Sequence, residues 1–180
     1  MMKEYRQRKL LRLKGHDYSL NNLYFITVCV NNRHHLFGEI DPKYNVGATL
    51  CGRPHNPDKM IEKWLLEIEN KFPFANIESY IVMPDHIHFI LHCEDKTGDH
   101  TGSPLHSVIG WFKTMTTNEY IKGVKSGIYE PFDKRLWQRG YFDHIIRNDS
   151  DLINIREYIE NNVCAWYDEV AEGIRKNYIN

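Results

Sequence analysis

The sequence lacks any apolar run long enough to cross a membrane, and no signal-peptide pattern opens it. Cysteine is scarce and scattered, with four residues in 180 and no C-x-x-C pair. This spacing argues against a disulfide framework and against a zinc site, so the thiols are expected to be reduced. These absences predict a cytoplasmic protein with no membrane association. The four cysteines are Cys29, Cys51, Cys93 and Cys164.

Internal repeats are also absent, and the formal net charge is only −1. A hydrophobic content of 42% with 26% charged residues is ordinary for a globular protein, and 180 residues are enough for one domain with a real core. Charge is nevertheless uneven, because residues 1–14 contain six basic residues and one acid. This basic arm is compatible with phosphate contacts and equally with a solvated terminus.

The periodicity of apolar residues predicts four strands and three main helices. Asp58 is expected to cap the first helix, Ser103-Pro104 to begin the second, and Asp149 or Ser150 to cap the third. Gly140 weakens the middle of the last strand, and residues 33–57 read as an irregular insertion. The predicted strands cover residues 23–30, 76–83, 86–93 and 136–147. This order predicts an α+β, ferredoxin-like (split βαβ) antiparallel sheet, with helices on one face and an additional C-terminal helix.

A histidine pair stands at the start of the third predicted strand, just after the turn at Met83-Pro84-Asp85. Side chains alternate along a strand, so Ile87 and Phe89 face a core while His86 and His88 share the other face. Two imidazoles at neighbouring positions on one face can bind one metal ion. A pair of ordinary sheet histidines is the alternative interpretation.

Tyr158 and Asn162 lie four residues apart on the last predicted helix, which makes them neighbours on its surface. Tyr158 falls at the edge of the apolar stripe, where a tyrosine can simply pack. Opposite a histidine pair, however, the Asn162 amide oxygen could be a third metal ligand. The Tyr158 phenolate could attack a phosphodiester polarised by that metal.

Three stretches together carry a family resemblance that covers about residues 23–166. They are Met83-Pro84-Asp85-His86-Ile87-His88, Leu136 to Arg147, and Tyr158-Ile159-Glu160-Asn161-Asn162. They resemble the REP-associated tyrosine transposases, which are relatives of the single-strand insertion-sequence transposases in the histidine–hydrophobic–histidine (HUH) nuclease superfamily. The resemblance implies that His86 and His88 bind the metal, that Asn162 completes the site, and that Tyr158 is the nucleophile.

The same resemblance implies the chemistry. Mg²⁺ or Mn²⁺ would polarise a scissile phosphate in single-stranded DNA that folds into hairpins, and Tyr158 would form a 5′-phosphotyrosine. Two positions depart from the family pattern: Val163 replaces the usual proline, which leaves the end of the helix open, and Asp85 stands where asparagine is common. Whether the protein is a monomer or a homodimer is left open.

Several basic residues are candidates for phosphate contacts, with a solvated charge as the alternative for each. They are Arg139, Arg147, Lys113, Arg6, Arg8, Lys9 and Arg12. His144 is interpreted as a structural, hydrogen-bonding residue near the site, and Trp137 as part of the core. Two rival functions remain: a catalytically silent DNA- or RNA-binding module on the same fold, and a rolling-circle replication or mobilisation nuclease.

Overall fold

The computed structural model of the chain describes residues 22–38, 57–94 and 104–162. The predicted basic arm, with Arg6, Arg8, Lys9 and Arg12, therefore lies outside the described residues. So do most of the predicted insertion, the Ser103 cap, and the end of the last helix at Val163. Within the described part of the chain, no helix combines the length and apolarity that a membrane span requires.

Four antiparallel strands form one sheet in the order β2-β3-β1-β4. This is the strand order that a ferredoxin-like β-α-β-β-α-β chain gives, so the predicted fold class is confirmed. A further helix, covering residues 149–162, follows the last strand. The elements are β1 (Asn22–Cys29), η1 (Asn31–Arg33), α1 (Pro57–Lys71), β2 (Ala75–Met83), β3 (His86–Cys93), α2 (Pro104–Lys125) and β4 (Phe142–Ile146).

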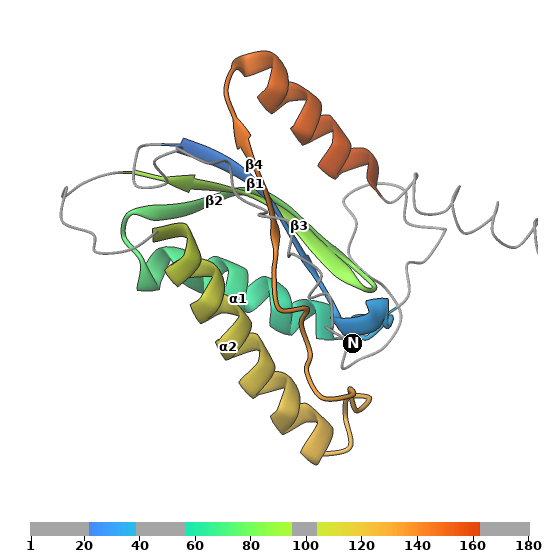
Figure 1. Ribbon diagram of the computed structural model, residues 1–180. Coiled ribbons are helices and arrows are strands. Elements are labelled where there is room, and N and C mark those ends of the chain that lie inside the picture. The colour runs from blue at the N-terminus through green and yellow to red at the C-terminus, as the bar shows by residue number, and fades with distance from the viewer. Residues whose placement is uncertain (1–21, 39–56, 95–103, 163–180) are drawn as a thin grey trace, which may run out of the picture.

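The two long helices α1 and α2 cover one face of the sheet, and the C-terminal helix lies on the other side (Figure 1). Alternation along the strands sends every second side chain toward α1 and α2, where the main core forms. Phe89 of β3 and Phe112 of α2 meet in this layer, with ring centroids 6.2 Å apart. Its fully buried members include Tyr24, Ile26, Val28, Ile61, Leu65, Ile68, Ile87, Phe89, Leu91, Val108 and Phe112.

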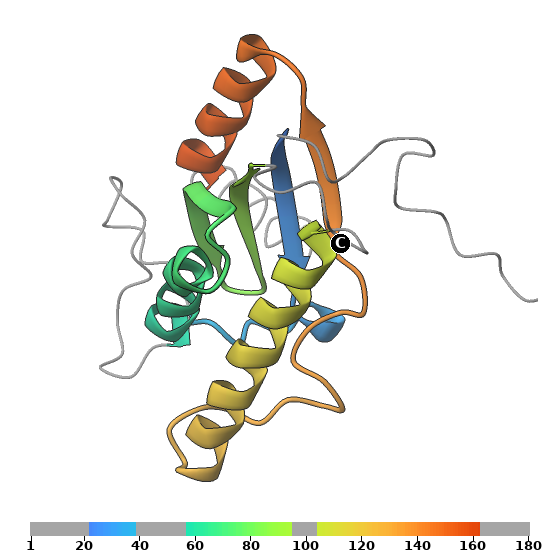
Figure 2. The same cartoon turned by 90° about the vertical axis from the view of Figure 1, so that its left-hand side faces the viewer.

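A second, smaller apolar cluster holds the C-terminal helix against the opposite face. Ile159 is its buried residue from the helix, and Leu152 and Ile155 pack at its margin. The strands contribute Ile81, Met83, Ile90 and Ile146. Figure 2 shows that β4 leads directly into this helix. A buried stripe on the C-terminal helix therefore fixes which side of it faces the sheet.

The last strand is shorter than predicted, because β4 begins at Phe142 instead of Leu136. The segment that precedes β4 is not part of the regular sheet. Trp137 makes an isolated bridge with Val30. Lys113 Nζ donates to the carbonyls of Gln138 (3.0 Å) and Gly140 (2.6 Å). Those carbonyls are therefore bound by a side chain of α2. Trp137 is buried in the main core, as predicted.

Helix boundaries also differ from the prediction at two places. Asn148 caps the C-terminal helix, since its Oδ1 accepts a hydrogen bond from the backbone N–H of Asp151 at 2.9 Å. Asp149 and Ser150 lie inside the first turn, so the predicted cap was wrong by one residue or two. Helix α1 begins at Pro57, so Asp58, the predicted cap, lies inside its first turn.

Candidate active site

His86 and His88 point from β3 toward the sheet face that α1 and α2 leave free, as their alternation predicts. They are not half-exposed sheet residues, because only 6% of His86 and 5% of His88 is accessible to solvent. Their Nε2 atoms lie 3.0 Å apart. Two buried ring nitrogens facing each other at this distance form a candidate ligand pair.

Each ring is held through its other nitrogen. Asp85 Oδ1 lies 2.5 Å from His86 Nδ1, and Thr27 Oγ1 lies 2.8 Å from His88 Nδ1. An ionised carboxylate can only accept, so Nδ1 of His86 is the donor in this pair, and the neutral ring then has its lone pair on Nε2. The Thr27 hydroxyl can donate or accept, so it fits both neutral tautomers of His88, one with a protonated Nε2 and one with the lone pair on Nε2.

Burial, together with smaller contributions from the neighbouring His86 and the Arg33 cation, lowers the pKa of His88 to about 3. His88 is therefore neutral over the physiological pH range. Neutral imidazole is the form that binds a metal ion.

Phe25 supports the pair from β1, in a way that the sequence analysis did not find. Its ring stacks on His88 with centroids 5.2 Å apart and an angle of 20° between planes. It also meets Tyr158 edge to face, with centroids 5.8 Å apart. Alternation along β1 places Phe25 and Thr27 on one face, but only the pairing of Thr27 with His88 shows that this is the histidine face.

Tyr158 lies beside the histidines in the same chain. Its hydroxyl is 3.4 Å from His88 Nε2, and 47% of the residue is exposed. The neighbouring Ile159 is buried in the small cluster and anchors the helix there. The Tyr158 helix thus lies against the histidine face, and no second chain is needed to bring the phenol to the pair.

Asn162 is buried, with 6% exposure, and follows Tyr158 by one helical turn. Its role as third ligand stays a prediction. Across the described ranges, no three His, Cys, Asp or Glu side chains gather into a metal-binding group. An ion at the histidine pair would therefore take its remaining ligands from an amide oxygen such as that of Asn162, from substrate or from water.

The histidine pair fits an ion such as Mg²⁺ or Mn²⁺ in its geometry. Two ligand atoms about 2.1 Å from one ion and at right angles to each other lie about 3.0 Å apart. This equals the separation of the two Nε2 atoms. The carboxylate behind His86 is also a common second partner for a metal-binding imidazole.

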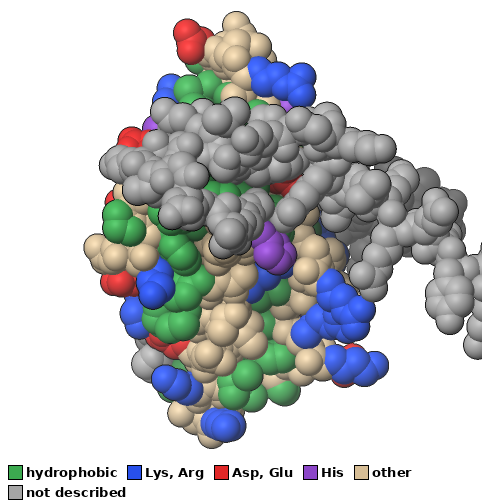
Figure 3. Space-filling view, turned by 60° about the vertical axis from the view of Figure 1, so that its left-hand side comes forward, with side chains coloured by type: hydrophobic (Ala, Val, Ile, Leu, Met, Phe, Trp, Pro, Cys, Tyr) green, Lys and Arg blue, Asp and Glu red, His purple; other side chains and the backbone are tan. Residues whose placement is uncertain are grey.

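The predicted phosphate-binding residues that the structure describes are spread over the molecule. Arg139 and Arg147 are exposed, whereas Lys113 Nζ is bound to two backbone carbonyls and burial lowers its pKa to about 8. In the view of Figure 3, Lys and Arg side chains form separate small groups instead of one continuous basic patch. A DNA contact by any of these three residues stays a prediction.

His144 connects β4 to the C-terminal helix. Its Nε2 lies 2.9 Å from Asp151 Oδ2, and that oxygen also accepts from the backbone N–H of Arg147 at 3.4 Å. The bond to His144 lowers the pKa of the Asp151 carboxyl. This geometry agrees with the structural role predicted for His144.

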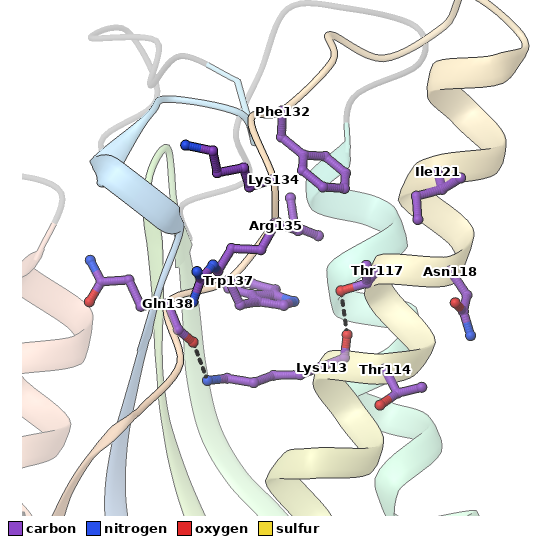
Figure 4. A pocket seen from close by; sticks show the side chains of 11 residues that line it. Lys113, Thr114, Thr117, Asn118, Ile121, Phe132, Lys134, Arg135, Trp137 and Gln138 are labelled. Atoms are coloured by element: carbon purple, nitrogen blue, oxygen red, sulfur yellow. Dashed lines mark hydrogen bonds between the residues drawn. The ribbon is translucent and has the colours of Figure 1, made fainter.

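A separate pocket of about 410 Å³ lies between α2 and residues 132–138 (Figure 4). Its lining includes Lys113 and Thr117 from α2 and Phe132 and Arg135 from the facing segment. None of the histidine pair or Tyr158 lines it, because α2 covers the other face of the sheet. The pocket is therefore distinct from the histidine site.

Comparison with known proteins places this arrangement in a family. The model of the IS200-like transposases matches residues 19–162. An uncharacterized protein of Haemophilus influenzae is 29% identical over 170 residues, which cover 88% of this chain and 89% of that protein. A second protein of that organism, provisionally named a REP-associated tyrosine transposase, is 27% identical over 110 residues, covering 57% of this chain and 53% of its own length.

A solved structure of a REP-associated tyrosine transposase bound to a REP hairpin has a similar fold. The TM-score is 0.52 and the identity 21%, with 89% of this chain and 72% of that one covered. The resemblance drawn from the three sequence motifs is thus confirmed. This chain belongs to the IS200-like transposase family, with REP-associated tyrosine transposases among its relatives.

Proposed function

We propose that the protein is a metal-dependent single-stranded DNA endonuclease and strand transferase that acts at hairpin-forming repeats. Tyr158 is the nucleophile, and His86, His88 and Asn162 hold Mg²⁺ or Mn²⁺. The observation that carries this proposal is the position of the Tyr158 hydroxyl, 3.4 Å from Nε2 of His88 and beside the facing pair of imidazoles. A nucleophile and a metal-ligand pair thus stand within reach of one phosphate.

The chain's own groups account for the geometry of the reaction. The small apolar cluster and the Phe25 ring hold the phenol at the site, while its exposure leaves room for a DNA strand to approach. The Tyr158 oxygen forms a bond to phosphorus as the bond from phosphorus to the 3′ oxygen breaks. The proton lost by the phenol is balanced by the one that the 3′ oxygen gains. The products are a 5′-phosphotyrosine and a free 3′-hydroxyl.

A bound divalent ion would supply electrophilic assistance by withdrawing electron density from the scissile phosphate. The neutral state of His88 and the lone pair on His86 Nε2 suit this role. Because the phosphoester energy is kept in the tyrosine bond, the released 3′-hydroxyl can reverse the reaction. Another strand's 3′-hydroxyl can replace it, which gives strand transfer without ATP.

Hairpin-forming single-stranded DNA is the substrate we infer. The support is the family itself and the similarly folded transposase, which is bound to a REP hairpin. The half-exposed Tyr158 lies on a surface that a flexible single strand can reach, in contrast to the buried histidines.

The decisive experiment is incubation of the protein with end-labelled single-stranded hairpin DNA and Mn²⁺, followed by denaturing electrophoresis. We expect a labelled covalent band that needs the metal and that disappears when the same sequence is offered as a full duplex. Hairpin binding without a covalent band, in Mg²⁺ and in Mn²⁺, would instead identify a silent DNA-binding module.

A further inference from the structure

Asp85 occupies the turn between β2 and β3 and is almost completely buried, with 2% exposure. Both of its carboxylate oxygens are engaged. Oδ1 lies 2.5 Å from His86 Nδ1, and Oδ2 lies 2.6 Å from Arg33 Nε. A buried carboxylate is costly unless it is paired and hydrogen-bonded, and here the two partners meet both needs.

Arg33 reaches Asp85 only because the chain turns sharply after β1. Asn32 and Arg33 both have φ of 57°, a left-handed conformation that is uncommon outside glycine. Two backbone hydrogen bonds hold this segment against the β2–β3 turn: Val30 N–H to Asp85 O (2.8 Å) and Phe37 N–H to Pro84 O (3.0 Å). Strain kept in place by surrounding bonds is typical of positions that serve a site.

The result is a continuous connection from Arg33 through Asp85 to His86 and on to His88. Arg33 is 47% exposed at its side chain, so the connection runs from the surface to the buried pair. An amide at position 85 could also accept the Nδ1–H of His86. It could not form the ion pair with Arg33, so the carboxylate is what joins the two.

We propose that Asp85 and Arg33 are positioning residues for the histidine pair. Asp85 fixes the tautomer and ring orientation of His86, so that its Nε2 lone pair faces His88, and Arg33 holds the Asp85 carboxylate in that orientation. The inference rests on the proposed function, because the metal site is what an ordered histidine pair would serve. It is tested first on the metal-free protein, where neither cleavage nor metal binding is needed.

The first readout is the tautomer of His86, read from the ¹⁵N shifts of its ring nitrogens in long-range ¹H–¹⁵N spectra of the metal-free chain. Wild type should show a protonated Nδ1 and a bare Nε2. Asp85→Ala should abolish this pattern, while Asp85→Asn should largely retain it. Asp58→Asn is the matched control, because Asp58 is equally buried but stands at the start of α1.

The second readout is Mn²⁺ affinity, measured from the electron paramagnetic resonance signal of free Mn²⁺. Asp85→Ala should weaken binding by about 10–100-fold, the usual effect of removing such a partner. Arg33→Gln should weaken it less, and adding it to Asp85→Asn should cause no further loss, because Arg33 acts through the carboxylate. Lys63→Gln, which breaks an ion pair with Glu119 between α1 and α2, should change nothing.

Each failure has a distinct meaning. An unchanged His86 tautomer in Asp85→Ala, with circular dichroism showing an intact fold, would overturn the positioning role. An Arg33→Gln variant that loses DNA affinity but keeps the tautomer and the Mn²⁺ affinity would make Arg33 a phosphate contact instead. If wild type binds no Mn²⁺ while Asp85→Ala still alters the tautomer, the proposed metal fails and the role of Asp85 in orienting the ring stands.

Discussion

The two faces of the sheet are built from the same strands but bury very different side chains. Toward α1 and α2 the strands present a continuous apolar layer, with Tyr24, Ile26 and Phe89 fully buried. Toward the C-terminal helix they present a small apolar cluster beside buried polar groups, among them His86 and His88. Apolar burial is the main source of folding free energy, so stability is concentrated on one face. The other face can therefore carry polar groups that the core would not tolerate.

Loss of the proposed nucleophile should give the largest effect on activity. It should leave unchanged the apolar core between the sheet and helices α1 and α2. Tyr158→Phe removes only the hydroxyl that lies 3.4 Å from His88 Nε2. We expect the covalent DNA band to fall by on the order of 10³-fold or more, with hairpin binding and the unfolding midpoint nearly unchanged. Gel assays with labelled hairpin DNA measure the band. Tyr141→Phe, on the α2 side near Lys113, is the control. Persistence of the adduct in Tyr158→Phe would assign the attack to another tyrosine.

Removing one histidine should separate activity from stability in a different way. His86→Ala is expected to reduce the metal-dependent adduct by more than about 100-fold, because one of the two imidazole ligands is lost. A chelator should leave the melting temperature of the wild-type protein unchanged, since the main core does not involve the pair. Thermal scans with and without chelator check this. A large fall in melting temperature on chelation would show that a metal supports the fold, and the contrast between the faces would then be wrong.

Truncating one buried apolar side chain on each face should show how much each face contributes to the free energy of unfolding. Phe89→Ala opens a cavity in the main core and should lower the free energy of unfolding by about 3–5 kcal/mol. Ile159→Ala removes the buried contact of the C-terminal helix and should cost about 2 kcal/mol, the low end for such a change. Urea denaturation followed by circular dichroism gives both values. Equal costs would mean that the small cluster contributes as much stability as the main core.

The last expected effect is a gain of stability, and it concerns Asp58, a polar group that is buried on the side of α1 and α2. Burial raises the pKa of Asp58 to about 6, and its Oδ2 has no hydrogen-bond partner among the described residues. The native state then binds more protons than the unfolded state between about pH 4 and 6, so stability falls as pH rises through this window. Asp58→Asn should remove that loss and stabilise the protein at pH 7 by at most about 3 kcal/mol, with little change below pH 4. Urea denaturation at both pH values tests it, and an Asp58→Asn variant that is less stable at pH 7 would contradict it.

The fold was largely predictable because its signals are local. Alternation along β3 gave the start of that strand and the opposite directions of Ile87 and His88. Helical spacing likewise placed Tyr158 at the edge of a buried stripe. Such patterns depend on residues close in sequence, which is why they can be recognised without coordinates.

The parts that could not be predicted depend on contacts between distant residues. Thr27 bonds to His88 because the register of β1 against β3 sets them opposite each other, and a single sequence does not specify that register. The shortened β4 reflects the binding of two carbonyls by Lys113, a residue in α2. Arg33 reaches Asp85 through a backbone conformation that no propensity scale assigns to arginine.

The left-handed turn at Asn32 and Arg33 also limits which amino acids can replace these two residues. Asparagine is among the few residues besides glycine that adopt this conformation readily, so position 32 suits its backbone. At position 33 the demands conflict, because glycine would relieve the backbone while only a long cationic side chain reaches Asp85. No single replacement satisfies both demands. In a saturation library selected for activity, position 33 should therefore tolerate far fewer residues than its exposure alone would suggest.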